Sequence, residues 1–197
     1  MRRLLVGAFC LLLAGCGGSG AGSALYVLGS TPASANASVV QTTFPVLEVK
    51  PVQFPSYLDT TDLVVRGPGG RLYPSTAGRW GERLSEGFTR ALAADLAGLL
   101  PRMAVMTEPP VERPAAQVLV DVETFEATTD GSVGLIARWT VTDGAARQVV
   151  ASERAVLSVR MQGTGDPAVV NAMTQAVQDL AGRIAARVAR FAPSRRR

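Results

Sequence analysis

With 197 residues, 47% of them hydrophobic, and a mean hydropathy of +0.20, the chain has enough apolar material for one packed domain. Its formal charge of +4 arises at the ends: without Arg2, Arg3 and the closing Arg195–Arg197, 15 basic residues face 16 acidic ones, which argues against nucleic-acid binding. The chain has no histidine and two cysteines, which excludes histidine-based triads, Cys/His dyads and the common zinc sites.

The first 16 residues are typical of an export signal. A positive start is followed by Leu4–Leu13, an apolar run too short to span a bilayer. The run ends in Leu13–Cys16 (LAGC), which resembles the bacterial lipobox, where the cysteine takes a diacylglyceryl group. We predict that residues 1–15 are a lipoprotein signal peptide and that Cys16 becomes the acylated first residue. The alternatives are an uncleaved anchor and an ordinary secretory signal that leaves Cys16 free.

Acylation of Cys16 fixes the expected location of the protein. Cys10 leaves with the signal, so the mature chain would hold no thiol for a disulfide. Gly17 follows Cys16, without the aspartate that signals inner-membrane retention in many Gram-negative lipoproteins, and we therefore predict the periplasmic face of the outer membrane. Residues 16–24 form the lipidated cysteine and a Gly/Ser-rich tether, whose average reach of about 15 Å holds the domain close to the lipid.

The first half of the domain is predicted to hold short strands and one helix. Alternation and turn residues favour strands at Leu25–Leu28, Val46–Phe54, Leu63–Arg66, Arg71–Tyr73 and Met103–Met106. Two of these strands flank Gly67–Gly70 and form a hairpin. From Gly81 to Leu100 the apolar residues step by three and four, which predicts an amphipathic helix with Ser85 as its cap and Pro101 as its stop.

The second half is predicted to be a three-stranded antiparallel meander and a long helix. The strands fall at Gln117–Phe125, Leu135–Val141 and Val149–Met161, joined by Asp-Gly turns. The helix spans Pro167–Phe191 with Asp166 as its cap. The predicted fold is α+β: a single domain, residues 25–191, in which two helices pack on one face of a mainly antiparallel sheet and leave the other face open to a partner. Residues 192–197 form a basic tail.

Few residues are candidates for chemistry. Asp121 and Glu123 share a strand face and suit a cation, but no third ligand lies near, and a solvated strand face explains them as well. Gly67–Gly70 lacks the Lys-Ser/Thr of a phosphate loop. Trp80 is either packed in the core or an exposed contact anchor. We predict no metal site, no cofactor and no enzyme activity.

Several short motifs follow the lipobox in a set order. They are Pro55–Asp59 (PSYLD), Leu63–Arg66 (LVVR), Arg79–Leu84 (RWGERL) and the helix that reaches Leu99–Pro101 (LLP). Together with the strands that follow, from about Leu25 to Ala189, they resemble the ABC-type transport auxiliary lipoproteins. Gly78 departs from the family pattern, which often has a polar or aromatic residue there.

The resemblance implies a function without chemistry. Members of the family are lipid-anchored, non-catalytic accessories of systems in which an ABC permease and ATPase work with mammalian-cell-entry (MCE) domain proteins to move lipids across the envelope. On this basis the predicted partner contact is at Tyr57, Leu58, Asp59 and Trp80, or alternatively on an exposed edge of the sheet. A homo-oligomer is plausible because MCE proteins form rings. The alternatives are an activator or scaffold of another envelope enzyme, such as a peptidoglycan synthase, and a periplasmic lipid carrier.

Overall fold

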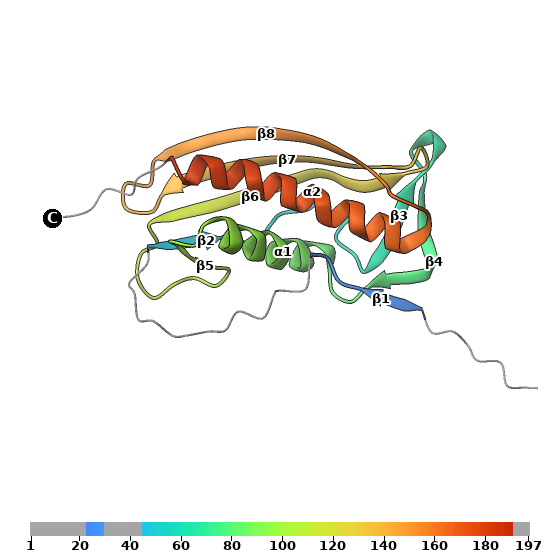
Figure 1. Cartoon of the computed structure of the whole chain (residues 1–197), viewed down its shortest axis with the longest axis horizontal. Helices are drawn as coiled ribbons and strands as arrows, with labels where there is room; N and C mark the ends of the chain where they lie inside the picture. Colours follow the sequence, from blue (N-terminus) through green and yellow to red (C-terminus); the bar gives the residue numbers. More distant parts are fainter. Residues whose placement is uncertain (1–22, 30–44, 191–197) are drawn as a thin grey trace, which may run out of the picture.

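Two helices lie side by side on one face of a mixed sheet (Figure 1). The computed structural model describes residues 23–29 and 45–190, so the predicted signal peptide, Cys16 and the basic tail lie outside the described residues. The elements are β1 (Ala24–Tyr26), β2 (Val46–Val49), β3 (Asp62–Arg66), the 3-10 turn η1 (Pro68–Gly70), β4 (Leu72–Trp80), α1 (Leu84–Leu99), β5 (Ala104–Met106), β6 (Ala116–Thr128), β7 (Ser132–Asp143), β8 (Val149–Arg160) and α2 (Gly165–Val188).

Strand β6 organises the sheet. One of its edges pairs along its length with antiparallel β7, which pairs in turn with antiparallel β8. Its other edge is shared, because the parallel strand β2 pairs with the start of β6 and the parallel strand β3 with its end. β4 and then β1 extend the sheet from β3, and β5 extends it from β2. The predicted α+β class, with both helices on one face and the meander of β6–β8, is therefore confirmed, and the short parallel pairs are an addition to it.

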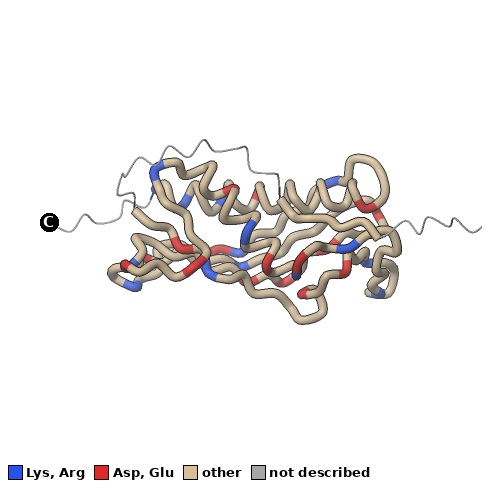
Figure 2. The backbone as a smooth tube through the Cα atoms, turned by 90° about the horizontal axis from the view of Figure 1, so that it is seen from below, with Lys and Arg blue, Asp and Glu red and all other residues tan. Residues whose placement is uncertain are grey.

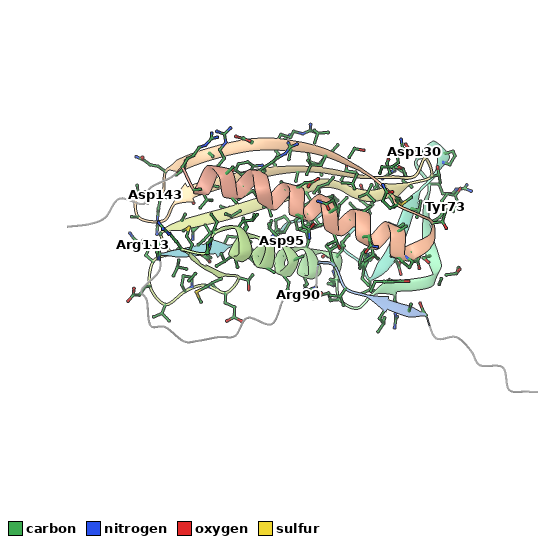
Figure 3. The ribbon with its side chains drawn as sticks, viewed as in Figure 1. Tyr73, Arg90, Asp95, Arg113, Asp130 and Asp143 are labelled. Atoms are coloured by element: carbon green, nitrogen blue, oxygen red, sulfur yellow. The ribbon has the colours of Figure 1, made fainter. Side chains whose placement is uncertain are left out.

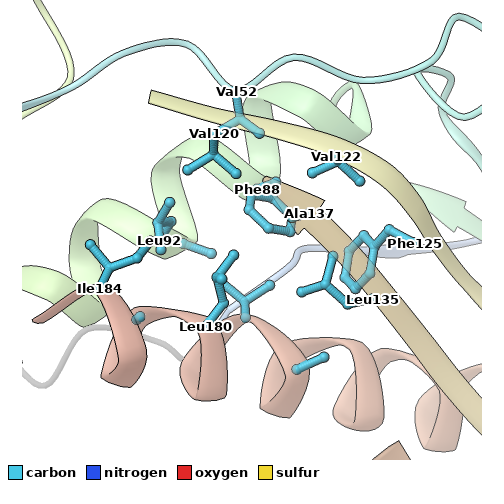
Figure 4. Packing of buried hydrophobic residues seen from close by; sticks show 14 of the residues in the cluster. Val52, Phe88, Leu92, Val120, Val122, Phe125, Leu135, Ala137, Leu180 and Ile184 are labelled. Atoms are coloured by element: carbon cyan, nitrogen blue, oxygen red, sulfur yellow. The ribbon is translucent and has the colours of Figure 1, made fainter. Parts of the chain in front are cut away.

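The core lies between the helices and the sheet. Val118, Val120 and Val122 of β6 point toward the helices, as the alternation predicts. A bulge between Val122 and Thr124 shifts the register, so that Phe125 also turns inward. Figure 4 shows Val120, Val122 and Phe125 packed against α1 and α2. Three phenylalanine rings meet edge to face there, with centroids 5.2–6.3 Å apart: Phe54, Phe88 and Phe125.

The boundary between β4 and α1 differs from the prediction. β4 runs on to Trp80, well past the predicted strand end at Tyr73, because it pairs with both β3 and β1. α1 consequently begins at Leu84 and not at Gly81. The predicted cap at Ser85 is also wrong: this residue lies inside the helix, and a carboxylate from elsewhere in the chain takes that role, as described below.

The start of α2 is a second correction. The helix begins at Gly165, after Thr164, which makes no capping hydrogen bond with its side chain. Asp166 lies inside the first turn, where its Oδ2 accepts a hydrogen bond from Ser75 Oγ at 2.7 Å. The positive end of the helix dipole stabilises a carboxylate at this position. The hydrogen bond from Ser75 also links α2 to β4. The helix ends at Val188, and Phe191, its predicted end, lies outside the described residues.

The molecule is elongated, and the two ends of the described chain lie at opposite ends of its long axis (Figure 1). One end holds β1, the β3–β4 hairpin and the start of α2; Tyr73 and Asp130 mark it in Figure 3. The 24 residues of α2, about 36 Å at 1.5 Å per residue, lead to the other end, where Arg113 and Asp143 lie. Neither helix of the described ranges is both long and apolar enough to cross a membrane.

Candidate partner-binding site

The structure brings together two motifs that are more than twenty residues apart in sequence. The segment around Asp59 precedes β3, and Trp80 ends β4 immediately before α1. The backbone N–H of Trp80 donates to the carbonyl of Thr61 at 2.8 Å, and that of Leu84 donates to Thr60 at 3.2 Å. The predicted contact residues therefore belong to one junction between sheet and helix.

Asp59 caps helix α1 from this neighbouring segment. Its Oδ1 accepts the backbone N–H of Ser85 at 3.2 Å, and its Oδ2 accepts Nη1 of Arg83 at 3.0 Å. Burial alone would raise the pKa of the Asp59 carboxyl, but the hydrogen bonds from Ser85 and the guanidinium of Arg83 outweigh it and lower this pKa below its usual value. Asp59 thus acts on the helix end and is held by the residues that it caps.

Replacing Asp59 with alanine is expected to lower the free energy of unfolding by about 1 kcal/mol at neutral pH, since the helix loses its cap. The pKa of Asp59 is lower in the folded than in the unfolded chain. Its contribution to stability is therefore present above the unfolded value of about 4 and is lost as the pH falls through the folded pKa. Urea unfolding followed from neutral to acidic pH should show a shallower loss of stability for Asp59→Ala than for the wild type.

Asp95 provides the matched control, because its replacement is expected to change stability in the opposite direction. It lies between the two helices in Figure 3, its Oδ2 is buried without a hydrogen-bond partner in the described chain, and burial raises its pKa. Ionisation of Asp95 above about pH 4 therefore opposes folding, and Asp95→Ala is expected to raise stability at neutral pH.

An Asp59→Ala chain that unfolds at the wild-type urea concentration at pH 7 would contradict the capping role of Asp59.

Of the four predicted contact residues, one is widely exposed. Leu58 and Trp80 are buried in the core, so Trp80 is a packing residue and not an exposed anchor. Asp59 is half-buried, whereas 45% of Tyr57 is exposed. Leu58 and Trp80 support the junction from inside. A partner contact at this site therefore depends on Tyr57, and its role in binding stays a prediction.

An ion pair next to Tyr57, between the half-buried Arg66 and the buried Glu126, escaped the sequence analysis. Nε of Arg66 in β3 donates to Oε1 of Glu126 in β6 at 2.5 Å, and its Nη1 donates to the carbonyl of Gly70 at 3.0 Å. The hydrogen bond to Glu126 raises the pKa of Arg66, burial opposes it, and Tyr57 adds to the rise. Glu126 is buried because β3 and Arg66 cover it. The bulge in β6 places Glu126 on this side of the sheet, and alternation without a bulge does not reveal it.

The remaining candidates are engaged in ion pairs and turns. Glu123 accepts hydrogen bonds from Arg138 at 2.9 Å and from Arg154 at 2.7 Å, and these pairs hold its pKa down, that with Arg154 most strongly. Gly67–Gly70 closes the β3–β4 hairpin. Among the described residues no three His, Cys, Asp or Glu side chains are placed to hold a metal. Acidic and basic positions are interspersed along the backbone of the described residues in Figure 2.

The structure explains why position 78 holds a glycine, where the family pattern often has a polar or aromatic residue. A Cβ at this position would lie 2.4 Å from the ring of Tyr26 and 2.7 Å from Oδ2 of Asp166. The absent side chain thus makes room for β1 and for the start of α2, which meet at this point on β4. Gly78 therefore serves the packing of this end of the molecule.

The sequence comparison decides the family. The sequence model of the family described as ABC-type transport auxiliary lipoprotein component matches residues 26–185, which is most of the chain. This chain belongs to the ABC-type transport auxiliary lipoprotein family. The family is one of accessory components and is not a known enzyme family. A comparison with curated proteins gave no match.

Two solved structures share the fold of this auxiliary lipoprotein. A protein described as uncharacterized is 20% identical, with a TM-score of 0.71, and the alignment covers 84% of this chain and 98% of that one. Protein XCC0632 from Xanthomonas campestris is 17% identical, with a TM-score of 0.62 and coverage of 83% and 90%. At these identities the likeness establishes the fold alone. It extends over the helices and the sheet of this auxiliary lipoprotein together.

Proposed function

We propose that this chain is a non-catalytic accessory of an ABC-type system that moves phospholipid across the Gram-negative envelope together with MCE-domain proteins. Acylated Cys16 holds it on the periplasmic face of the outer membrane, and the folded domain docks the periplasmic part of the machinery there. One observation carries the proposal: the family match begins at residue 26, ten residues after the lipobox cysteine. An anchor and an accessory domain thus stand in the order that docking requires.

The site supports a role in binding. Its charged residues are paired with one another: Asp59 with Arg83, and Glu126 with Arg66. Tyr57 is exposed and interacts with Arg66, and the residue that follows it, Leu58, is buried. A rigid aromatic side chain on a well-packed base is the usual form of an interface hot spot. We therefore place the partner contact at Tyr57, with Leu58, Asp59 and Trp80 as its support.

Replacing Tyr57 with alanine is expected to lower the affinity for the MCE-domain and permease subunits about tenfold, which corresponds to about 1.4 kcal/mol. The experiment is a detergent pull-down with the acylated full chain, followed by identification of the captured subunits and titration of the complex. Val156→Ala is the control, since Val156 is 57% exposed and lies in β8, which pairs with β7 and not with β3 or β4. Equal recovery with both variants would exclude Tyr57 from the contact.

The same pull-down separates the alternatives. Capture of peptidoglycan synthases without MCE or permease subunits would identify an activator of wall synthesis. A lipid carrier would be purified with close to one phospholipid per chain, whereas a docking module would not. The packed core between helices and sheet, with three aromatic rings at its centre, supports docking over carrying.

A further inference from the structure

Strand β1 and the residue directly after it present two large aliphatic side chains to solvent. Leu25 is 61% exposed and Val27 is 54% exposed, whereas Tyr26 between them is half-buried and Leu28 is buried. This alternation places Leu25 and Val27 on one side of the chain. Single exposed apolar residues are common on protein surfaces, but a pair on one side of an edge strand forms a continuous apolar strip.

The strip is held rigidly against the domain. β1 pairs in parallel with β4, and the carbonyl of Tyr26 accepts the N–H of Gly81 at 2.8 Å. Nη2 of Arg90 donates to the carbonyl of Leu28 at 2.9 Å, and the N–H of Gly29 donates to Oγ1 of Thr174 at 3.2 Å. The backbone on both sides of Val27 is thus fastened to β4, α1 and α2. The outward position of the two side chains is a property of the fold.

The strip also lies where the chain enters the domain. Only seven residues separate Cys16 from Ala24. Their composition gives an average reach of about 15 Å, and full extension gives roughly 25 Å. The opposite end of the molecule lies about the length of α2, roughly 36 Å, away (Figure 1). If Cys16 is embedded in a bilayer, β1 is therefore the element that meets the lipid surface first.

Arg79 supplies a cationic group next to the strip. It pairs in register with Leu25, so both side chains lie on the same face of the sheet, and it is exposed without an ion pair in the described chain. An arginine can lay its aliphatic stem along an apolar surface and place its guanidinium among phosphates. Asp62 lies beside Arg79 on β3 and is also exposed. The apolar strip therefore makes the larger contribution to the contact with lipid, and the charge of Arg79 makes a smaller one.

We propose that Leu25, Val27 and Arg79 form a lipid-contacting surface that lays the β1 end of the domain on the bilayer. The contact rests on the proposed acylation of Cys16, because the acyl chains bring β1 to the lipid. It adds a fixed orientation to the tethered domain. The bound chemistry is that of a phospholipid surface, with aliphatic side chains in the boundary layer and the arginine at the phosphates.

The test uses single thiols in the acylated full chain. After loss of Cys10 and acylation of Cys16, the mature chain carries no other thiol. Leu25→Cys and Val27→Cys are labelled with an environment-sensitive fluorophore and reconstituted in vesicles of phosphatidylethanolamine and phosphatidylglycerol. Val111→Cys is the control, since Val111 is fully exposed in the loop before β6. An aqueous quencher should become at least threefold less effective at positions 25 and 27 on vesicles, and unchanged at 111.

Flotation of the same vesicles tests the acyl anchor separately from the lipid contact of Leu25, Val27 and Arg79. A chain that does not float lacks the anchor, and the proposed function fails with the inference. A chain that floats while the labels at 25 and 27 stay fully open to the quencher overturns the inference alone. Protection that appears only after addition of partner subunits overturns it in favour of a protein contact. Arg79→Glu should reduce protection on vesicles with phosphatidylglycerol, and unchanged protection would remove Arg79 from the surface.

Discussion

Replacing Cys16 with serine is expected to remove the protein from the outer-membrane fraction completely. Serine offers no thiol for the diacylglyceryl group, so no acyl chain reaches the bilayer, where each buried methylene contributes about 0.8 kcal/mol. The apolar strip of Leu25 and Val27 is too small to replace two acyl chains. The measurement is separation of inner and outer membranes by density, together with the mass of the amino-terminal peptide.

Gly17→Asp is the matched variant for this result. It keeps Cys16 and its acyl chains, but it places aspartate directly after the lipidated residue. The chain should then remain acylated and move to the inner-membrane fraction. A Cys16→Ser protein that stays in the outer membrane would contradict the lipid anchor. A Gly17→Asp protein that stays there would contradict only the sorting signal.

Replacing Gly144 with alanine is expected to destabilise the domain by about 3 kcal/mol. A Cβ at this position would lie 1.8 Å from the carbonyl oxygen of Pro114 and 2.8 Å from its carbonyl carbon, and neither is a side chain that can turn away. The turn after β7 must therefore move, and the hydrogen bond from the N–H of Gly144 to the carbonyl of Ala115 at 3.0 Å is lost. Urea unfolding followed by circular dichroism measures the change.

Gly134→Ala is the control for this substitution. Gly134 lies in β7 as well, but a Cβ there would meet no atom within 4 Å. Its replacement should leave stability unchanged or raise it slightly, because alanine restricts the unfolded chain. Equal effects of the two substitutions would show that the close approach of the turn to Pro114 does not limit stability.

Local patterns in the sequence predicted the elements well. The Asp-Gly turns and the alternation of Val118, Val120 and Val122 fixed the meander, and the three- and four-residue steps fixed both helices. The pairing of β6 with β2 and β3 was not predictable, because parallel partners that are far apart in sequence leave no local pattern. The bulge after Val122 lies in the antiparallel pair of β6 and β7 and was hidden because the extra residue leaves the alternation of the neighbouring residues without a distinct signal, and with it the orientation of Glu126 was hidden.

The candidate site was predicted in part. The motifs around Asp59 and Trp80 do meet in space, but the sequence did not show which side chain of each motif faces outward. Trp80 is buried because β4 extends to it, pairs it with Tyr26 of β1 and makes it part of the core. The cap of α1 comes from Asp59, which lies before β3 and is separated from the helix by β3 and β4. Capping patterns consider only residues adjacent to the helix, so they selected Ser85 instead.

The two ends of the described chain lie at opposite ends of the molecule, and this determines how far the domain reaches from the bilayer. If β1 rests on the lipid, the length of α2 puts the β7–β8 turn about 36 Å above the bilayer. A partner that binds the β7–β8 turn must itself span the distance between this turn and the membrane in which the partner resides. A fluorescent label at position 190, just after α2, would report on that height at a point remote from the anchor.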